Sequence, residues 1–108
     1  MSKVITSPVA KWPGTVTISD PLTLPQAIAV EHAINAVMAL EGASQRVVNY
    51  TLLPGICQCV EAWNLEGLGA LTAETFPATP RKASAELAAW LVNEVTALYK
   101  DAEEIPNE

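Results

Sequence analysis

Residues 44–63 read SQRVVNYTLLPGICQCVEAW, and this stretch decides the fold. Pro54 and Gly55 interrupt its middle, and a proline inside a helix removes one hydrogen bond and crowds the preceding turn. The apolar pattern nevertheless keeps its phase through Pro54, which predicts one helix from Ser44 to Trp63 with a kink at the proline. The alternative is a true break at Leu53, before the Pro-Gly pair. The apolar stripe at helical spacing consists of Val48, Leu52, Ile56, Cys59, Val60 and Trp63.

Two further helices are expected on either side of this stretch. Residues 23–26, TLPQ, match a capping box with Thr23 as the N-cap, so a first helix is expected to begin there and to end at Gly42. The last helix is expected to open at Thr79-Pro80, because threonine is a good N-cap and proline suits the first helical position. The apolar seam of the first helix is Ala27, Val30, Ile34, Val37 and Met38, and that of the last is Leu87, Leu91, Val95, Leu98 and Ala102.

Residues 1–21 have a different character from the rest. Residues 4–6 (VIT) and 15–18 (TVTI) are short β-branched runs, and a loop signature, Trp12-Pro13-Gly14, lies between them. Val16 and Ile18 alternate with threonines, which is the pattern of a half-buried strand. A β-hairpin, or one strand plus an extended arm, is expected. Two strands alone are marginal in water, so they must pack on the helices or pair with another chain.

Together these patterns predict a mainly α fold class, a three-helix domain with the second helix kinked at Pro54 and a small N-terminal β-hairpin or extended arm. The 108 residues are expected to form a single domain, in which residues 1–21 are a β-rich arm, 22–104 a helical body and 105–108 a frayed tail. Half of the residues are hydrophobic, which is enough for a core without disulfides or metal.

The charge distribution argues against some classes of partner. The net charge is −6, and the six basic residues are scattered, so no basic stripe for nucleic acid can be built from them. No apolar run reaches the roughly 20 residues that span a bilayer, and the first residues do not resemble a signal peptide. The expected protein binds neither nucleic acid nor membranes and is cytoplasmic.

The chemically reactive residues form no recognisable constellation. His32 is the single histidine, and no ligand pattern surrounds it. Cys57 and Cys59 would lie on nearly opposite faces of a helix, and small buried side chains explain them. The acidic residues lie where solvated faces or caps place them. No catalytic residue, metal or cofactor is therefore expected, and an enzyme or small-molecule binder is the least favoured of three functional classes.

A protein-binding surface is the favoured alternative to a pocket. The first helix carries more apolar surface than one seam requires, and the hairpin has free edges, so helix-in-groove binding or strand addition is expected. A hydrophobic helical partner fits this surface, and a homo-oligomer is the other possibility. Trp12 either caps the core or is an exposed anchor. The candidate binding residues are Trp12, Val16, Ile18, Leu24, Ile28 and Leu40.

Several segments carry a family resemblance: WPGTV at 12–16, DPLT at 20–23, VEAWNLEGL at 60–68, FPATPR at 76–81 and AWL at 89–91. With them, the chain resembles the short tail assembly chaperones of long-tailed, siphovirus-like phages and prophages. The resemblance implies a non-enzymatic protein of the host cytoplasm that binds the tape-measure protein during tail assembly and does not remain in the virion.

The family is often made in two lengths by a ribosomal frameshift, so the resemblance implies that a longer form would diverge within the acidic end, 101–108. No binding residue transfers by motif. The alternative function is a small structural or ring-forming virion subunit that self-associates through its N-terminal strands.

Overall fold

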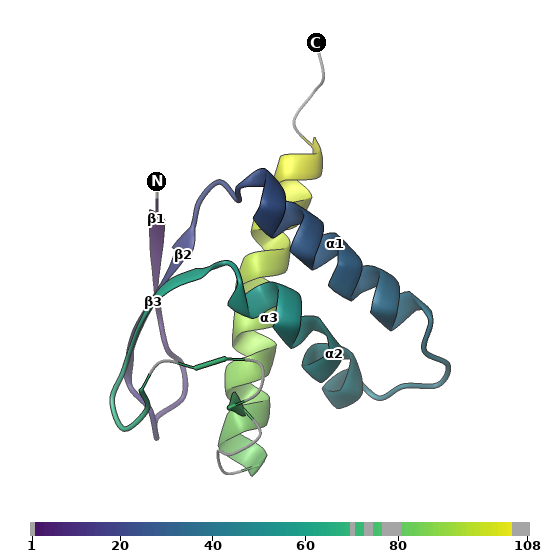
Figure 1. Cartoon of the computed structure of the whole chain (residues 1–108). Coiled ribbons are helices and arrows are strands. Elements are labelled where there is room, and N and C mark those ends of the chain that lie inside the picture. The colour runs from purple at the N-terminus through teal and green to yellow at the C-terminus, as the bar shows by residue number, and fades with distance from the viewer. Residues whose placement is uncertain (1, 70, 73–74, 77–80, 105–108) are drawn as a thin grey trace.

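The structure is a computed structural model that describes residues 2–69, 71–72, 75–76 and 81–104 (Figure 1). These residues form an antiparallel sheet and three helices in the order β-β-α-α-β-α. The elements are β1 (Ser2–Thr6), β2 (Gly14–Ser19), α1 (Leu24–Met38), α2 (Gln45–Cys57), β3 (Val60–Leu65) and α3 (Arg81–Glu104).

The segment that follows Pro54 differs from the sequence prediction. Helix α2 is continuous through Pro54 but ends at Cys57, and Val60–Leu65 is a strand rather than the end of a helix. The mainly α prediction with a two-stranded hairpin is therefore wrong, and the fold is mixed, with a three-stranded sheet. The physical reason is that β2 needs a second partner for its backbone N–H and C=O groups, and β3 supplies it. A short apolar run such as this one fits either helix or strand.

The start of helix α1 agrees with the sequence prediction, but its end does not. The Thr23 side chain accepts a hydrogen bond from the Gln26 N–H at 3.3 Å, and the Gln26 side chain accepts one from the Thr23 N–H at 2.9 Å, which confirms the capping box. Helix α1 ends at Met38, before Gly42, whose φ of +63° lies in the following loop. Thr79-Pro80 and the tail 105–108 lie outside the described residues.

The sheet has one covered face and one open face. Its strand order is β1-β2-β3, with Ile5 opposite Val16 and Ile18 opposite Val60, and a bulge interrupts the second ladder next to Thr17. Ile5, Val16 and Ile18 are buried on the inner face, whereas Val4 is exposed on the other. This alternation is the expected consequence of the side-chain period of two.

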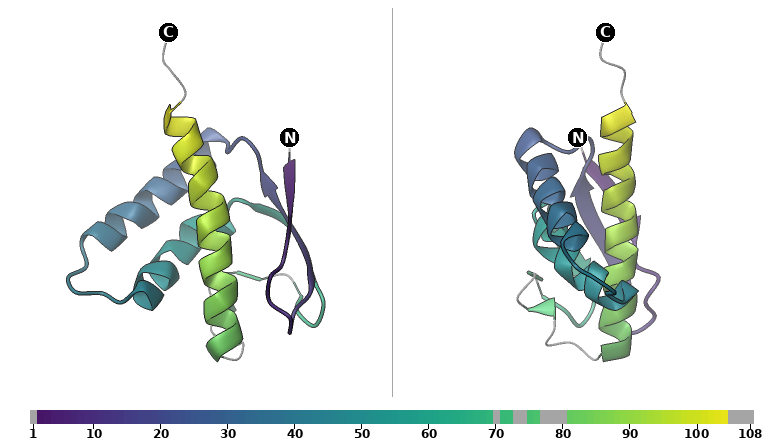
Figure 2. Two further views of the ribbon diagram at one scale, coloured as in Figure 1. Left: turned by 180° about the vertical axis from the view of Figure 1, so that it is seen from behind. Right: turned by 90° about the vertical axis from the view of Figure 1, so that its right-hand side faces the viewer.

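Helix α3 packs across both halves of the molecule. In the left view of Figure 2 it lies in front, with the α1–α2 hairpin behind it on one side and the sheet on the other. Its inward residues Leu87, Leu91 and Val95 are fully buried in the same cluster as the sheet residues. Lys3 Nζ of β1 and Glu94 Oε1 of α3 lie 3.7 Å apart, so an ion pair adds to this packing.

Gly55 sets how closely α1 and α2 approach each other. A Cβ atom placed on Gly55 would lie 2.6 Å from the backbone oxygen of Ala29 and 3.1 Å from the Ala33 Cβ. The glycine therefore marks a close crossing of two helices. The Pro-Gly pair that looked like a helix breaker has a packing role.

Candidate protein-binding surface

Half of the sequence-predicted binding residues lie in the core. Trp12 is 4% exposed, and Val16 and Ile18 are fully buried. The Trp12 ring lies against the turn after β3, where a Cβ on Gly67 would be 3.4 Å from its Cδ1. Trp12 is therefore a core cap and not an exposed anchor. Val16 and Ile18 are covered because β3 completes the sheet and α3 packs against it.

The other predicted residues lie on the surface. Leu24 is 74% exposed and Ile28 is 44% exposed on the outer side of α1, and Leu40 is exposed just beyond it. Met38 is also exposed, although its spacing placed it in the buried seam. It belongs to the last turn of α1, and helical spacing alone does not reveal where the neighbouring elements end.

A groove runs between α1 and α2. Its volume is about 480 Å3, and it includes Ile28, one of the predicted residues. Its floor is formed at the close crossing by Gly55, so the two helices come together beneath it. The sequence does not reveal the groove, because its lining residues are mostly small and come from two different helices. The lining residues are Pro25, Ile28, Ala29, His32, Ala33, Ala36, Thr51, Pro54, Gly55 and Gln58.

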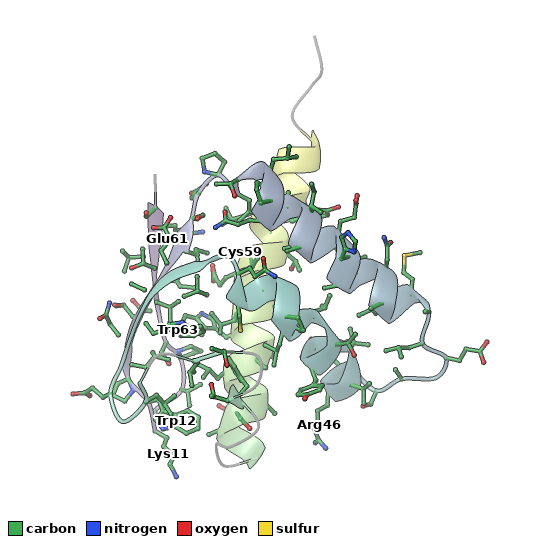
Figure 3. All side chains as sticks on the ribbon, in the orientation of Figure 1. Lys11, Trp12, Arg46, Cys59, Glu61 and Trp63 are labelled. Atoms are coloured by element: carbon green, nitrogen blue, oxygen red, sulfur yellow. The ribbon has the colours of Figure 1, made fainter. Side chains whose placement is uncertain are left out.

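A polar network fixes α1 against the sheet. The Glu61 carboxylate accepts hydrogen bonds from the hydroxyls of Ser2 and, at 2.8 Å, Ser19, and Figure 3 shows Glu61 at the upper end of β1. Gln26 Nε2 in turn donates to Ser19 Oγ at 2.9 Å and to the Gln58 carbonyl at 3.3 Å. The hydrogen bonds from Ser2 and Ser19 hold the pKa of Glu61 below its usual value.

Replacing Ser19 with alanine is expected to raise the pKa of Glu61, because the carboxylate loses one donor to its charged form. A lowered folded-state pKa stabilises the protein above the unfolded-state pKa, and this contribution is lost as pH falls through the folded-state pKa. The Ser19→Ala protein should therefore lose less stability than the unmodified chain when acidified across that range. Carbon-detected NMR titration of Glu61 measures the shift. Ser44→Ala, which removes the α2 cap instead, should leave it unchanged, and an unmoved pKa in Ser19→Ala would contradict the network.

The two cysteines are not placed for thiolate chemistry. Cys57 is the last residue of α2, and Cys59 is buried just before β3, with its Sγ 3.6 Å from the Gly55 carbonyl oxygen. Burial raises the pKa of Cys57 to about 11. Burial and the neighbouring Cys57 raise the pKa of Cys59 to about 11 as well. Both thiols are therefore protonated at neutral pH.

Metal ligation and membrane insertion were assessed over the same part of the chain. Among the described residues, no group of three or more His, Cys, Asp or Glu side chains is placed to hold a metal ion. None of the described helices has the length and apolar character needed to cross a membrane. Comparisons with protein-family models, curated proteins and solved structures found no match to this chain.

Proposed function

We propose that this chain is a non-catalytic tail assembly chaperone of a long-tailed phage or prophage, and that it binds the tape-measure protein through the α1–α2 groove. The observation that supports the proposal is the groove itself, which is lined by the exposed apolar residue Ile28, with exposed Leu24 four residues earlier on α1. Single exposed apolar residues are common on protein surfaces, but apolar residues beside a groove indicate a binding site.

The shape of the groove suits a helical segment of the partner. Ala29, Ala33 and Ala36 follow one another along α1 at helical spacing, and Gly55 and Pro54 face them from α2. Small side chains let a third helix approach closely, and Ile28 supplies an apolar anchor at the border. A hydrophobic, helical tape-measure segment would bury this surface during assembly.

Replacing Ile28 with glutamate is expected to weaken binding of a co-expressed tape-measure fragment at least about tenfold, because a charge is buried without a partner at the contact. The matched control is Val47→Glu. Val47 is 45% exposed, against 44% for Ile28, but it lies in the first turn of α2 and does not line the groove. A pull-down detects the complex, and titration calorimetry with the purified fragment and each purified variant measures the difference in affinity.

Both variants should retain the helical circular dichroism of the unmodified chain, since both positions are on the surface. If the unmodified chain retains no tape-measure fragment when both proteins are folded, the chaperone proposal fails. Equal binding by the Ile28→Glu and Val47→Glu proteins would leave the chaperone proposal standing and remove the groove from it.

The ring-forming subunit is the second candidate, and the exposed edge of β1 favours it. Strand β1 pairs on one side only within the described sheet, and its residue Val4 is exposed on the open face. An unpaired edge can add a strand from another copy. Light scattering that finds only monomer at high concentration would remove this candidate.

A further inference from the structure

We propose that a second hollow, between α2 and α3, binds a small amphipathic carboxylate. This α2–α3 pocket has a volume of about 280 Å3 and shares no lining residue with the α1–α2 groove. Its walls are apolar, formed by the buried side chains of Leu53, Phe76 and Ala88. An apolar pocket with a few polar groups at defined positions is typical of small-molecule sites.

The first polar group is Asn49, which lines the pocket and is only 8% exposed. Its Oδ1 accepts a hydrogen bond from Gln45 Nε2 at 3.0 Å. Within the described part of the chain, its Nδ2 donates no hydrogen bond, so a donor faces the pocket without an acceptor. Every buried side-chain polar atom of the described residues has a hydrogen-bond partner, so Nδ2 is accessible from the pocket, where an oxygen of a ligand can accept from it.

The second feature is positive potential at the mouth of the pocket. Arg46, Asn49, Ser84 and Ala85 line it, so the first two turns of both α2 and α3 surround it, and Figure 1 shows both helices beginning at the same end of the molecule. Helix N-termini carry partial positive charge, and neither helix has an acidic residue in its first turn. Anions are therefore favoured at this end.

Arg46, which lines the pocket, adds to this potential. It is the second residue of α2, at the end where the helix dipole disfavours a cation. Figure 3 shows the Arg46 side chain projecting from the start of α2, and it forms no ion pair with any described residue.

These features specify the ligand class. A carboxylate has two oxygens, one for the Asn49 Nδ2 donor and one for the Arg46 guanidinium at the rim. The apolar walls and the volume suit an aryl or alkyl chain of roughly six to ten carbon atoms. The inference is independent of the proposed chaperone function, because the two sites are separate.

The test titrates the full, nitrogen-15-labelled chain with 4-phenylbutyrate and follows the amide signals by NMR. Saturable shifts are expected at the Asn49 side-chain amide and at the backbone of Ser84 and Ala85. The neutral analogue 4-phenylbutanol should bind about tenfold more weakly, because it lacks the charge that Arg46 and the helix N-termini favour. Arg46→Gln, an exposed substitution, should weaken binding of the carboxylate about fivefold or more.

Two alanines on α3 provide a matched pair of steric variants. Ala85→Leu fills the pocket and should abolish the saturable shifts, whereas Ala97→Leu adds the same side chain at an exposed position of the same helix and should leave them intact. The proposal is overturned by any of three results: no saturable shift at the pocket residues, equal affinity for the alcohol, or undiminished binding to the Ala85→Leu protein. None of these results bears on tape-measure binding at the α1–α2 groove.

Discussion

Replacing Trp12 with alanine is expected to destabilise the folded chain by about 3–5 kcal/mol, as is usual for truncating a buried aromatic residue. Trp12 is 4% exposed, and its ring lies against the turn at Gly67. The substitution leaves a large cavity between the β1–β2 loop and the end of β3. Because domains of this size are stable by only about 5–15 kcal/mol, this loss is a large fraction of the total free energy of unfolding. Urea unfolding followed by circular dichroism measures the loss.

Two controls separate burial from partner binding. Trp12→Phe keeps most of the apolar volume and should cost clearly less, while Leu24→Ala, at a position that is 74% exposed, should change stability by no more than about 0.5 kcal/mol. If Trp12→Ala kept the unfolding midpoint of the unmodified chain but lost partner binding, Trp12 would be a surface anchor and its placement in the core would be wrong.

Replacing Gly14 with alanine is expected to cost about 3 kcal/mol or more. The Gly14 φ of +135° lies in a region that residues with side chains rarely adopt, and a Cβ there would lie 2.1 Å from the Asn64 carbonyl oxygen. The backbone has little room to move, since Gly14 pairs with Leu65 and the neighbouring Pro13 carbonyl accepts from the Glu66 N–H at 2.8 Å. Relief of the clash requires β2 and β3 to separate.

Gly42→Ala is the matched control for this prediction. Gly42 also has positive φ, +63°, but a Cβ there would meet nothing within 4 Å, so only the conformational cost of about 1–2 kcal/mol remains. The difference between the two denaturation midpoints reports the clash with β3 together with the less favourable φ of Gly14. Equal losses in the Gly14→Ala and Gly42→Ala proteins would show that β3 does not pair with β2 at this position.

The candidate site was predictable in part. Leu24 and Ile28 were identified from surplus apolar surface on one helix, because helical spacing shows how many apolar residues a single seam can bury. The groove beside them was not predictable. It depends on the close crossing of α1 and α2 at Gly55, which is a contact between residues far apart in the sequence. Val16 and Ile18 were placed on the correct face of a strand, but the layer that covers them was missing from the prediction.

Features that depend on nearby residues followed from the sequence alone. Thr23 and Gln26 cap α1 through bonds that span three residues, and the stripe at Leu87, Leu91 and Val95 of α3 is buried as its spacing predicts. Such hydrogen bonds and periodicities are local, so neighbouring side chains determine them. The tertiary structure alone decided the outcome of the stretch 44–63. Helix α2 could have continued past Cys57, but the unpaired edge of β2, more than 40 residues earlier in the chain, offered backbone hydrogen bonds that made Val60–Leu65 a strand.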